Sequence, residues 1–390
     1  MSNALHSLKL KTGGDVWSWG SATSGQLGDN TTTNRSSPVS VVGAHSFTAI
    51  AGGENHSLAL KSTGEVWSWG LATSGQLGDN TTDNKSSPVS VVGAHSFTAI
   101  AGGEDHSLAL KSTGEVWAWG FATSGQLGNN ATSQRSSPVS VVGAHSFTAI
   151  NSGNAHSLAL KNTGEVWSWG RGGTGQLGDN TITFKSSPVS VVGAHSFTAI
   201  SGGDLFSLAL KNTGEVWSWG TNLTGKAPGH SGVLGDNTDT NRSSPVSVVG
   251  AHSFTAIAGG YIHSLALKST GEVWSWGYNN SGQLGDNTTD NKSSPVSVVG
   301  AHSFTAIVAS GDHSLGLKST GEVWSWGLAT SGQLGDNATT NRSSPVSVVG
   351  LLSAAAGSIS KISGVAWAST SKVSGVAQAS VSKVTGVSAT

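Results

Sequence analysis

Most of this chain is one sequence unit written seven times. The unit begins at His56 in its most regular copy and recurs every 50 residues, except for one interval of 57 that carries an insertion near Lys226. A Trp-x-Trp-Gly motif marks every copy, starting at Trp17, Trp67, Trp117, Trp167, Trp217, Trp274 and Trp324. Units of this size cannot each bury a core, so they must pack against one another. The period predicts a solenoid, a propeller or an array.

Each unit has the pattern of four short strands. His56–Leu60 and Val66–Gly70 alternate large and small residues, as half-buried strands do, and a Gly-containing loop, Lys61–Glu65, joins them. Phe97–Ile100 is apolar on both faces, which is typical of a strand buried on both sides. Pro88–Val92 begins with a proline, which cannot donate to a ladder and suits an outer edge. Four antiparallel strands in seven units predict an all-β, seven-bladed β-propeller.

Three motifs recur in order in the unit: His-Ser-Leu-Ala-Leu, Gly-Glu-Val-Trp-Ser-Trp-Gly and Gly-Gln-Leu-Gly. Together they resemble the RCC1 (regulator of chromosome condensation) repeat family across roughly residues 4–350. The resemblance implies a seven-bladed propeller, in agreement with the strand pattern. It also implies relatives that act as regulators or inhibitors by binding proteins. No segment matches the wedge by which the family's exchange factor acts on a small GTPase.

The two ends of the chain are expected to complete the ring. Ser-Phe-Thr-Ala-Ile occurs only six times, so the first blade lacks its inner strand, and Leu351–Gly357 stands where a seventh copy would be. We therefore predict that this C-terminal segment closes blade one, and that residues 1–357 form the propeller domain. Residues 358–390 form a tail with an 11-residue period that is either disordered or used for assembly. The tail weakly resembles short repeats of bacteriophage and other viral structural proteins.

Comparison of the seven copies predicts a disc with two different faces. Label the strands of a blade A to D from the centre outward. The loops between B and C and between D and A hardly change, whereas the A–B and C–D loops vary, and antiparallel order puts both on one face. Either these loops drift freely, or this face binds a partner. The candidate partner-binding residues are Leu71, Phe121, Arg171, Lys226, His230, Tyr261, Tyr278 and Leu328, with the aromatic residues expected to be exposed anchors.

The composition argues against several other functions. A net charge of −1 predicts no nucleic-acid binding, and no segment reaches the ~20 apolar residues of a membrane span. The absence of cysteine excludes a thiol nucleophile. Two histidine series recur, from His6 and from His45, and a structural role is expected for both, with hydrogen bonds to backbone groups inside the blade for the first. No motif of paired carboxylates, nucleophile or phosphate loop is present, so we predict a non-enzymatic protein without metal or cofactor.

Two functions remain from the sequence. The first is a virion- or surface-associated component, whose varied face binds a protein or glycan receptor and whose tail mediates a larger assembly or a homo-oligomer. The alternative is a soluble protein-binding regulator or inhibitor of the RCC1-like superfamily. The N-terminus has no apolar signal region, so synthesis in the cytoplasm is expected.

Overall fold

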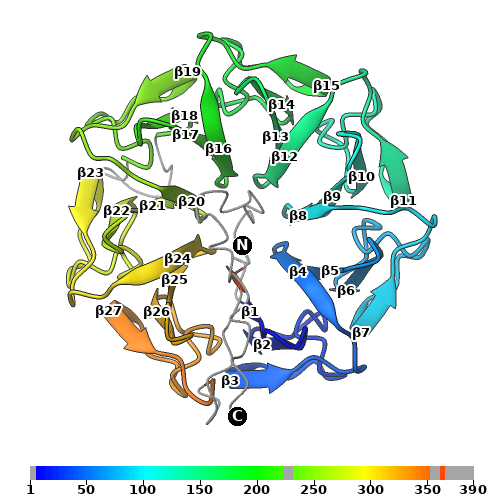
Figure 1. Cartoon of the computed structure of the whole chain (residues 1–390), viewed down its shortest axis with the longest axis horizontal. Helices are drawn as coiled ribbons and strands as arrows, with labels where there is room; N and C mark the ends of the chain where they lie inside the picture. Colours follow the sequence, from blue (N-terminus) through cyan, green and yellow to red (C-terminus); the bar gives the residue numbers. More distant parts are fainter. Residues whose placement is uncertain (1–5, 223–231, 352–360, 365–390) are drawn as a thin grey trace, which may run out of the picture.

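A computed structural model describes residues 6–222, 232–351 and 361–364 of the chain. The described residues form seven four-stranded antiparallel sheets, arranged around a centre like the blades of a propeller (Figure 1). The prediction of an all-β, seven-bladed propeller is therefore confirmed. Blade 1 has the strand order β28-β1-β2-β3, and blades 2 to 7 each use four strands that are consecutive in the chain.

The strands fall into four rings, from the centre to the rim. The inner strands are β28 (Lys361–Gly364), β4 (Phe47–Gly52), β8 (Ala99–Gly102), β12 (Phe147–Ser152), β16 (Phe197–Gly202), β20 (Ala256–Gly259) and β24 (Phe304–Ala309). The second strands are β1 (His6–Leu10), β5 (His56–Lys61), β9 (His106–Leu110), β13 (His156–Lys161), β17 (Phe206–Lys211), β21 (His263–Leu267) and β25 (His313–Lys318).

The two outer rings carry the tryptophan motif and the proline. The third strands are β2 (Val16–Gly20), β6 (Val66–Gly70), β10 (Val116–Gly120), β14 (Val166–Gly170), β18 (Val216–Gly220), β22 (Val273–Gly277) and β26 (Val323–Gly327). The outer strands are β3 (Arg35–Ser40), β7 (Lys85–Ser90), β11 (Arg135–Ser140), β15 (Lys185–Ser190), β19 (Arg242–Ser247), β23 (Lys292–Ser297) and β27 (Arg342–Ser347).

The predicted outer strand, Pro88–Val92, is wrong in its bounds, because β7 begins at Lys85 and ends at Ser90. Ser68 pairs with Val89 but Gly70 pairs with Lys85, so the strand bulges at the proline. A bulge needs no ladder donor, which is why proline is tolerated inside this strand. The bulge also frees the Ser86 carbonyl, which accepts a 2.9 Å hydrogen bond from Asn30 N of the preceding blade.

The core consists of seven apolar clusters, each lying between two adjacent blades. Between blades 2 and 3, Trp119 packs against Leu58 and Val66 of the preceding blade. Its indole Nε1 donates to the Gln76 carbonyl at 2.9 Å. Gly78 has a φ of 70°, and a Cβ there would lie 2.7 Å from the same indole nitrogen, so this position requires glycine. The Gly-Gln-Leu-Gly motif therefore packs against the second tryptophan of the neighbouring blade and accepts its hydrogen bond.

A C-terminal strand closes blade 1, as predicted, but not the strand that was expected. β28 pairs antiparallel with β1, whereas Leu351 of the predicted segment is buried in the cluster between blades 7 and 1. The prediction that Leu351–Gly357 supplies this strand is therefore wrong, because residues 361–364 take the place beside β1; the part of the predicted segment after Leu351 lies outside the described residues. β28 lies in residues predicted as the tail, and the boundary after residue 357 stays a prediction.

The seam between blades 7 and 1 lacks a phenylalanine that the other six junctions have. At those junctions the backbone N of a phenylalanine donates to a glycine carbonyl of the preceding blade, as Phe97 N does to Gly64 O at 3.0 Å. At the seam, the fully buried Lys9 donates from Nζ to Gly321 O at 3.3 Å. Lys9 occupies the position that is Ala59 in blade 2, so a lysine replaces the missing donor.

Candidate functional site

Hydrogen bonds confirm that the loops divide between two faces of the disc. On one side, the C–D loop of blade 2 meets the A–B loop of blade 3, where Gln76 Nε2 donates to Asp105 Oδ1 at 2.9 Å. On the other, the D–A loop meets the B–C loop, where Ser96 Oγ donates to the Thr63 carbonyl at 3.2 Å. We call the side with the A–B and C–D loops the varied face, and the opposite side the uniform face.

The uniform face repeats one cluster of contacts around the ring. In blade 2, the His45 ring lies 4.2 Å from the Trp67 ring, and the Lys61 ammonium lies 4.5 Å from the same indole. Lys61 also pairs with Glu65 at 3.3 Å. Burial, with a contribution from Lys61, lowers the pKa of His45. These contacts, together with the bond from Ser96 Oγ to the Thr63 carbonyl between adjacent blades, explain why the sequence of these loops hardly changes.

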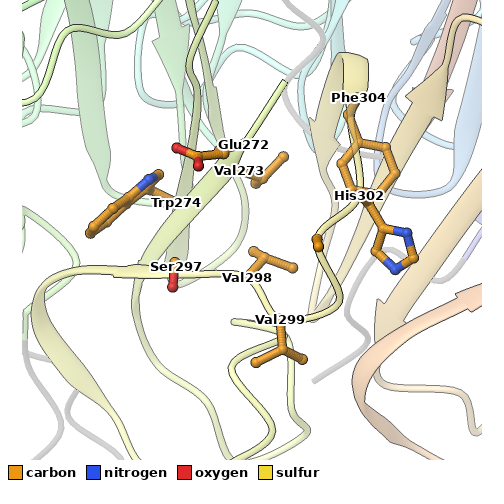
Figure 2. A pocket seen from close by; sticks show the side chains of 9 residues that line it. Glu272, Val273, Trp274, Ser297, Val298, Val299, His302 and Phe304 are labelled. Atoms are coloured by element: carbon orange, nitrogen blue, oxygen red, sulfur yellow. The ribbon is translucent and has the colours of Figure 1, made fainter. Parts of the chain in front are cut away.

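A pocket of about 270 Å³ opens on the uniform face between blades 6 and 7 (Figure 2). Trp274 and Val298 come from blade 6, and His302 and Phe304 come from the loop that enters blade 7. The same residue types recur at the matching positions of the other blades. The pocket therefore belongs to the shared architecture and carries no feature of its own.

At the centre of the varied face, the A–B loops are joined by backbone hydrogen bonds. Glu54 N donates to Gly103 O at 3.2 Å, and Glu104 N donates to Asn154 O at 3.1 Å. The chain of bonds continues through Asp204, whose N donates to Tyr261 O at 3.3 Å. Since these loops carry several carboxylates, the centre of this face is acidic.

The acidic centre changes the titration of its neighbours. Burial raises the pKa of Asp105 to about 6, with the Glu104 carboxylate adding to the shift and the Gln76 amide opposing it. Burial also raises the pKa of Tyr261, and the carboxylates of Asp204 and Glu54 add to it. The Tyr261 hydroxyl therefore lies within reach of acids from several blades, and Tyr261 is half-buried where an exposed anchor was expected.

Most of the predicted contact residues are less exposed than expected. Leu71, Tyr278 and Leu328 are half-buried at the start of their C–D loops, and so is Phe121, which was expected as an exposed anchor. Each residue of this kind is held by a backbone bond to the A–B loop, as where Leu71 N donates to Asn55 O at 2.8 Å. Arg171 is the exposed exception in this series. The predicted residues Lys226 and His230 lie outside the described residues.

Three exposed residues on this face were not among the residues predicted from the sequence. Ile182 is 66% exposed and Phe184 is 54% exposed, the two highest values among the large apolar residues that the structure describes. Arg135 is exposed where its counterparts are half-buried. All three could have been found by comparing copies, because blade 3 has Asn129 where blade 2 has Asp79, and blade 4 has Ile182 and Phe184 where blade 2 has Thr82 and Asn84.

The first histidine series is structural, but its contacts run between blades and not inside one blade as predicted. His56 Nε2 lies 2.9 Å from Ser107 Oγ of the next blade, and Ser107 Oγ donates to the Gln76 carbonyl. The serine therefore accepts from the histidine N–H. The series forms six links, which begin at His6, His56, His106, His156, His263 and His313. Phe206 replaces the histidine in blade 5.

Neither a metal site nor a membrane span is found in the part of the chain that the structure describes. No three histidine, aspartate or glutamate side chains there gather closely enough to hold an ion. The Asp79 loop instead makes turn bonds, with Thr81 N donating to Asp79 Oδ1 at 3.0 Å. Over the same residues, no helix is long and apolar enough to cross a membrane.

The fold and the repeated contacts define a seven-bladed β-propeller with one uniform and one varied face. The RCC1-like domain model matches residues 2–248 and 142–374, so the chain belongs to the RCC1-like domain family. Comparison with curated proteins gave no match.

Solved structures of this family share the fold. Human WBSCR16 is 21% identical with a TM-score of 0.75, covering 88% of this chain and 94% of that one. Prp20p from Saccharomyces cerevisiae, studied with its binding properties to Gsp1p and histones, is 24% identical with a TM-score of 0.75 and 87% coverage of both chains. Yeast RCC1 (Prp20) bound to Kap60 is 22% identical with a TM-score of 0.74, covering 89% and 85%.

Proposed function

We propose that this chain is a non-enzymatic regulator or inhibitor that binds another protein through its varied face. The observation that carries the proposal is the confinement of sequence variation to that face. Residues that hold the blades together, such as Trp119 and Gly78, keep the same role in most copies, so the variable positions beside them are free to follow a partner. Propellers commonly present such loops on a rigid scaffold.

The neighbouring structures favour this proposal over a virion component. Two of them concern Prp20 with protein partners, Kap60 in one and Gsp1p and histones in the other. Such partners support protein binding by this chain too, whereas nothing in these structures points to a glycan receptor or to assembly through the tail. A location in the virion or at the cell surface stays a prediction from the sequence.

The test is a capture experiment with the full chain and two variants. In the first variant, the A–B loops and first C–D positions of every blade copy those of blade 2. In the second, Val92 and its counterparts on the rim of the uniform face are changed to lysine. We expect at least one partner to bind the native chain and the second variant but not the first. The proposal would be overturned if the first variant captured the same partners as the native chain.

A further inference from the structure

Blades 3 and 4 differ from the rest of the varied face in their charges. In every blade except blade 3, an aspartate before the outer strand pairs with the lysine or arginine at the start of that strand, as Asp29 pairs with Arg35 at 2.8 Å. Blade 3 has Asn129 at this position. Asn129 keeps the turn bond to Ala131 N at 3.3 Å but supplies no charge. Arg135 is consequently exposed and has no ion pair among the described residues.

Blade 4 adds a second cation of the same kind. Arg171 stands where other blades have Ser21, Leu71 or Phe121. Its backbone N donates to Ala155 O at 2.8 Å, which fixes the start of the loop. The guanidinium is exposed and, within the described ranges, forms no ion pair. Two arginines of adjacent blades are thus left without an acid of their own chain.

The loop of blade 4 also pushes two apolar side chains into solvent. In blade 2, Asn84 Oδ1 accepts from Ala72 N at 2.9 Å and ties the end of the loop to its start. In blade 4 the corresponding residues are Phe184 and Gly172. A Cβ on Gly172 would overlap the Thr183 carbonyl, so the two ends of the loop lie closer together than alanine would allow. The Phe184 side chain has no oxygen that could accept this hydrogen bond, and the residue is exposed.

The segments that carry these residues are neighbours on the varied face, and we call Arg135, Arg171, Ile182 and Phe184 the patch. Asn130, next to Asn129, donates from its backbone N to Ser186 O at 2.8 Å, which links blade 3 to the segment just after Phe184. On the other side, the Phe184 ring lies 3.4 Å from where a Cβ of Gly173 would stand, two residues from Arg171. The patch therefore runs from the blade 3 arginine across the exposed aromatic ring to the blade 4 arginine.

We propose that this patch, made of Arg135, Arg171, Ile182 and Phe184, docks an acidic peptide segment of a partner protein that also carries apolar side chains. The inference rests on the proposed function and names the part of the varied face that does the binding. Arginines beside exposed aromatic residues are the usual composition of binding hot spots. Exposed apolar side chains gathered at one place mark interaction sites.

The charge of the patch selects an acidic partner over the protein's own tail. Two arginines without acids attract carboxylates, and Arg binds them in a bidentate way. Residues 358–390 contain Lys361, Lys372 and Lys383 but no aspartate or glutamate. The tail is therefore repelled by the patch, and an acidic segment of another protein is the complementary occupant.

The probe for this proposal is a library of short random peptides displayed on phage and selected on the full chain. We expect the enriched peptides to combine Asp or Glu with Leu, Phe or Trp, and to bind more weakly at high salt. Asn129→Asp would pair Arg135 again, and Phe184→Asn would restore the blade 2 residue. Each change is expected to raise the dissociation constant of the enriched peptides about tenfold or more.

The matched control is Asp336→Asn in blade 7, which removes the only acid paired with Arg342 among the described residues but lies far from the patch, and it should leave the affinity unchanged. Circular dichroism confirms that each variant folds. The proposal would be overturned if neutral or basic peptides were enriched, or if the Asn129→Asp and Phe184→Asn variants bound the enriched peptides as tightly as the native chain does. If Tyr278→Leu abolished binding while those variants did not, this inference would fail and the proposed function would stand. If no change on the varied face altered the binding of the enriched peptides, both this inference and the proposed function would be overturned.

Discussion

The uniform and varied faces are built by the same seven blades, but their loops are held in different ways. On the uniform face, His45, Lys61 and Glu65 all make contacts around Trp67 of their own blade, so a change at any of them removes a contact. On the varied face, the fixed contacts are made between blades by the buried tryptophan and the Gln-Leu-Gly segment. The positions between those contacts are free to change.

The different contacts of the two faces indicate how sequence variation within a repeat protein should be interpreted. The sequence of the uniform face is constant because its side chains are needed for the contacts around the half-buried tryptophans. This constancy is therefore no sign of a binding partner. Variation on the varied face favours partner binding there, and a particular site is indicated where a change leaves a charge without its ion pair or places an apolar ring in solvent. Blades 3 and 4 meet this criterion at Arg135 and Phe184.

The two histidine series give the largest test of this comparison. Burial lowers the pKa of five inner histidines to about 3: His56, His106, His156, His263 and His313. In the unfolded chain each binds a proton near pH 6.5, so stability falls as the pH drops below that value. At pH 5 the loss is about 2 kcal/mol for each histidine, and their total rivals the whole stability of a domain. We expect cooperative unfolding near pH 5, measured by tryptophan fluorescence.

A variant based on blade 5 provides the control for acid unfolding. Phe206 occupies the histidine position beside Gly203 there, just as His56 lies beside Gly53. His56→Phe should move the acid midpoint to lower pH, whereas His95→Gln on the uniform face should move it much less. A chain that stays folded at pH 4 would show that the inner histidines are not buried in this way.

The two tryptophans of one motif separate the faces directly. Trp119 is fully buried between blades, whereas Trp117 is half-buried against His95 and Lys111. Trp119→Ala should cost about 3–5 kcal/mol of unfolding free energy, and Trp117→Ala about 1 kcal/mol. Urea titration of both variants measures the two losses. Equal losses would contradict the view that the blades are joined mainly through the second tryptophan.

Lys9 tests the seam, where the regular contacts between blades are interrupted. Burial, and to a smaller extent Lys11, lowers the pKa of Lys9 from 10.5 to about 8. The unfolded chain then holds a proton that the folded chain has lost between these values, so stability rises with pH across this window, by up to about 3 kcal/mol. Chemical unfolding at pH 8 and pH 10 should show this rise. The Lys9→Met variant should lack it, and a rise of the same size there would assign the effect to other groups.

The smallest effect is expected on the uniform face. Glu65 pairs with Lys61, but its side chain is 59% exposed. Glu65→Gln should therefore change the free energy of unfolding by about 0.5 kcal/mol or less. Thermal unfolding at low and high salt checks this value. A loss above 1 kcal/mol would mean that the ion pairs of this face hold the disc together more strongly than their exposure suggests.

Much of the fold follows from residues that recur. The alternation in His56–Leu60 and Val66–Gly70 predicted two strands with correct starts, and the missing seventh copy of Ser-Phe-Thr-Ala-Ile predicted closure by the C-terminus. The closing strand itself was misplaced, because position after the last repeat favoured Leu351–Gly357, although Ile362–Gly364 of β28 has the same three residues as Ile200–Gly202 of β16. The exposure of Phe121 and Tyr261 was overestimated, since backbone bonds between the loops draw both residues inward.

The sequence by itself determined the number of blades, their strand order and the polarity of the disc, because all three are consequences of periodicity. Tertiary structure alone decided which side chains meet across blades. The inner histidines contact a serine of the next blade, and Lys9 donates to Gly321 O across the seam. Such contacts join residues far apart in the chain, and they depend on how the blades pack and not on any local pattern.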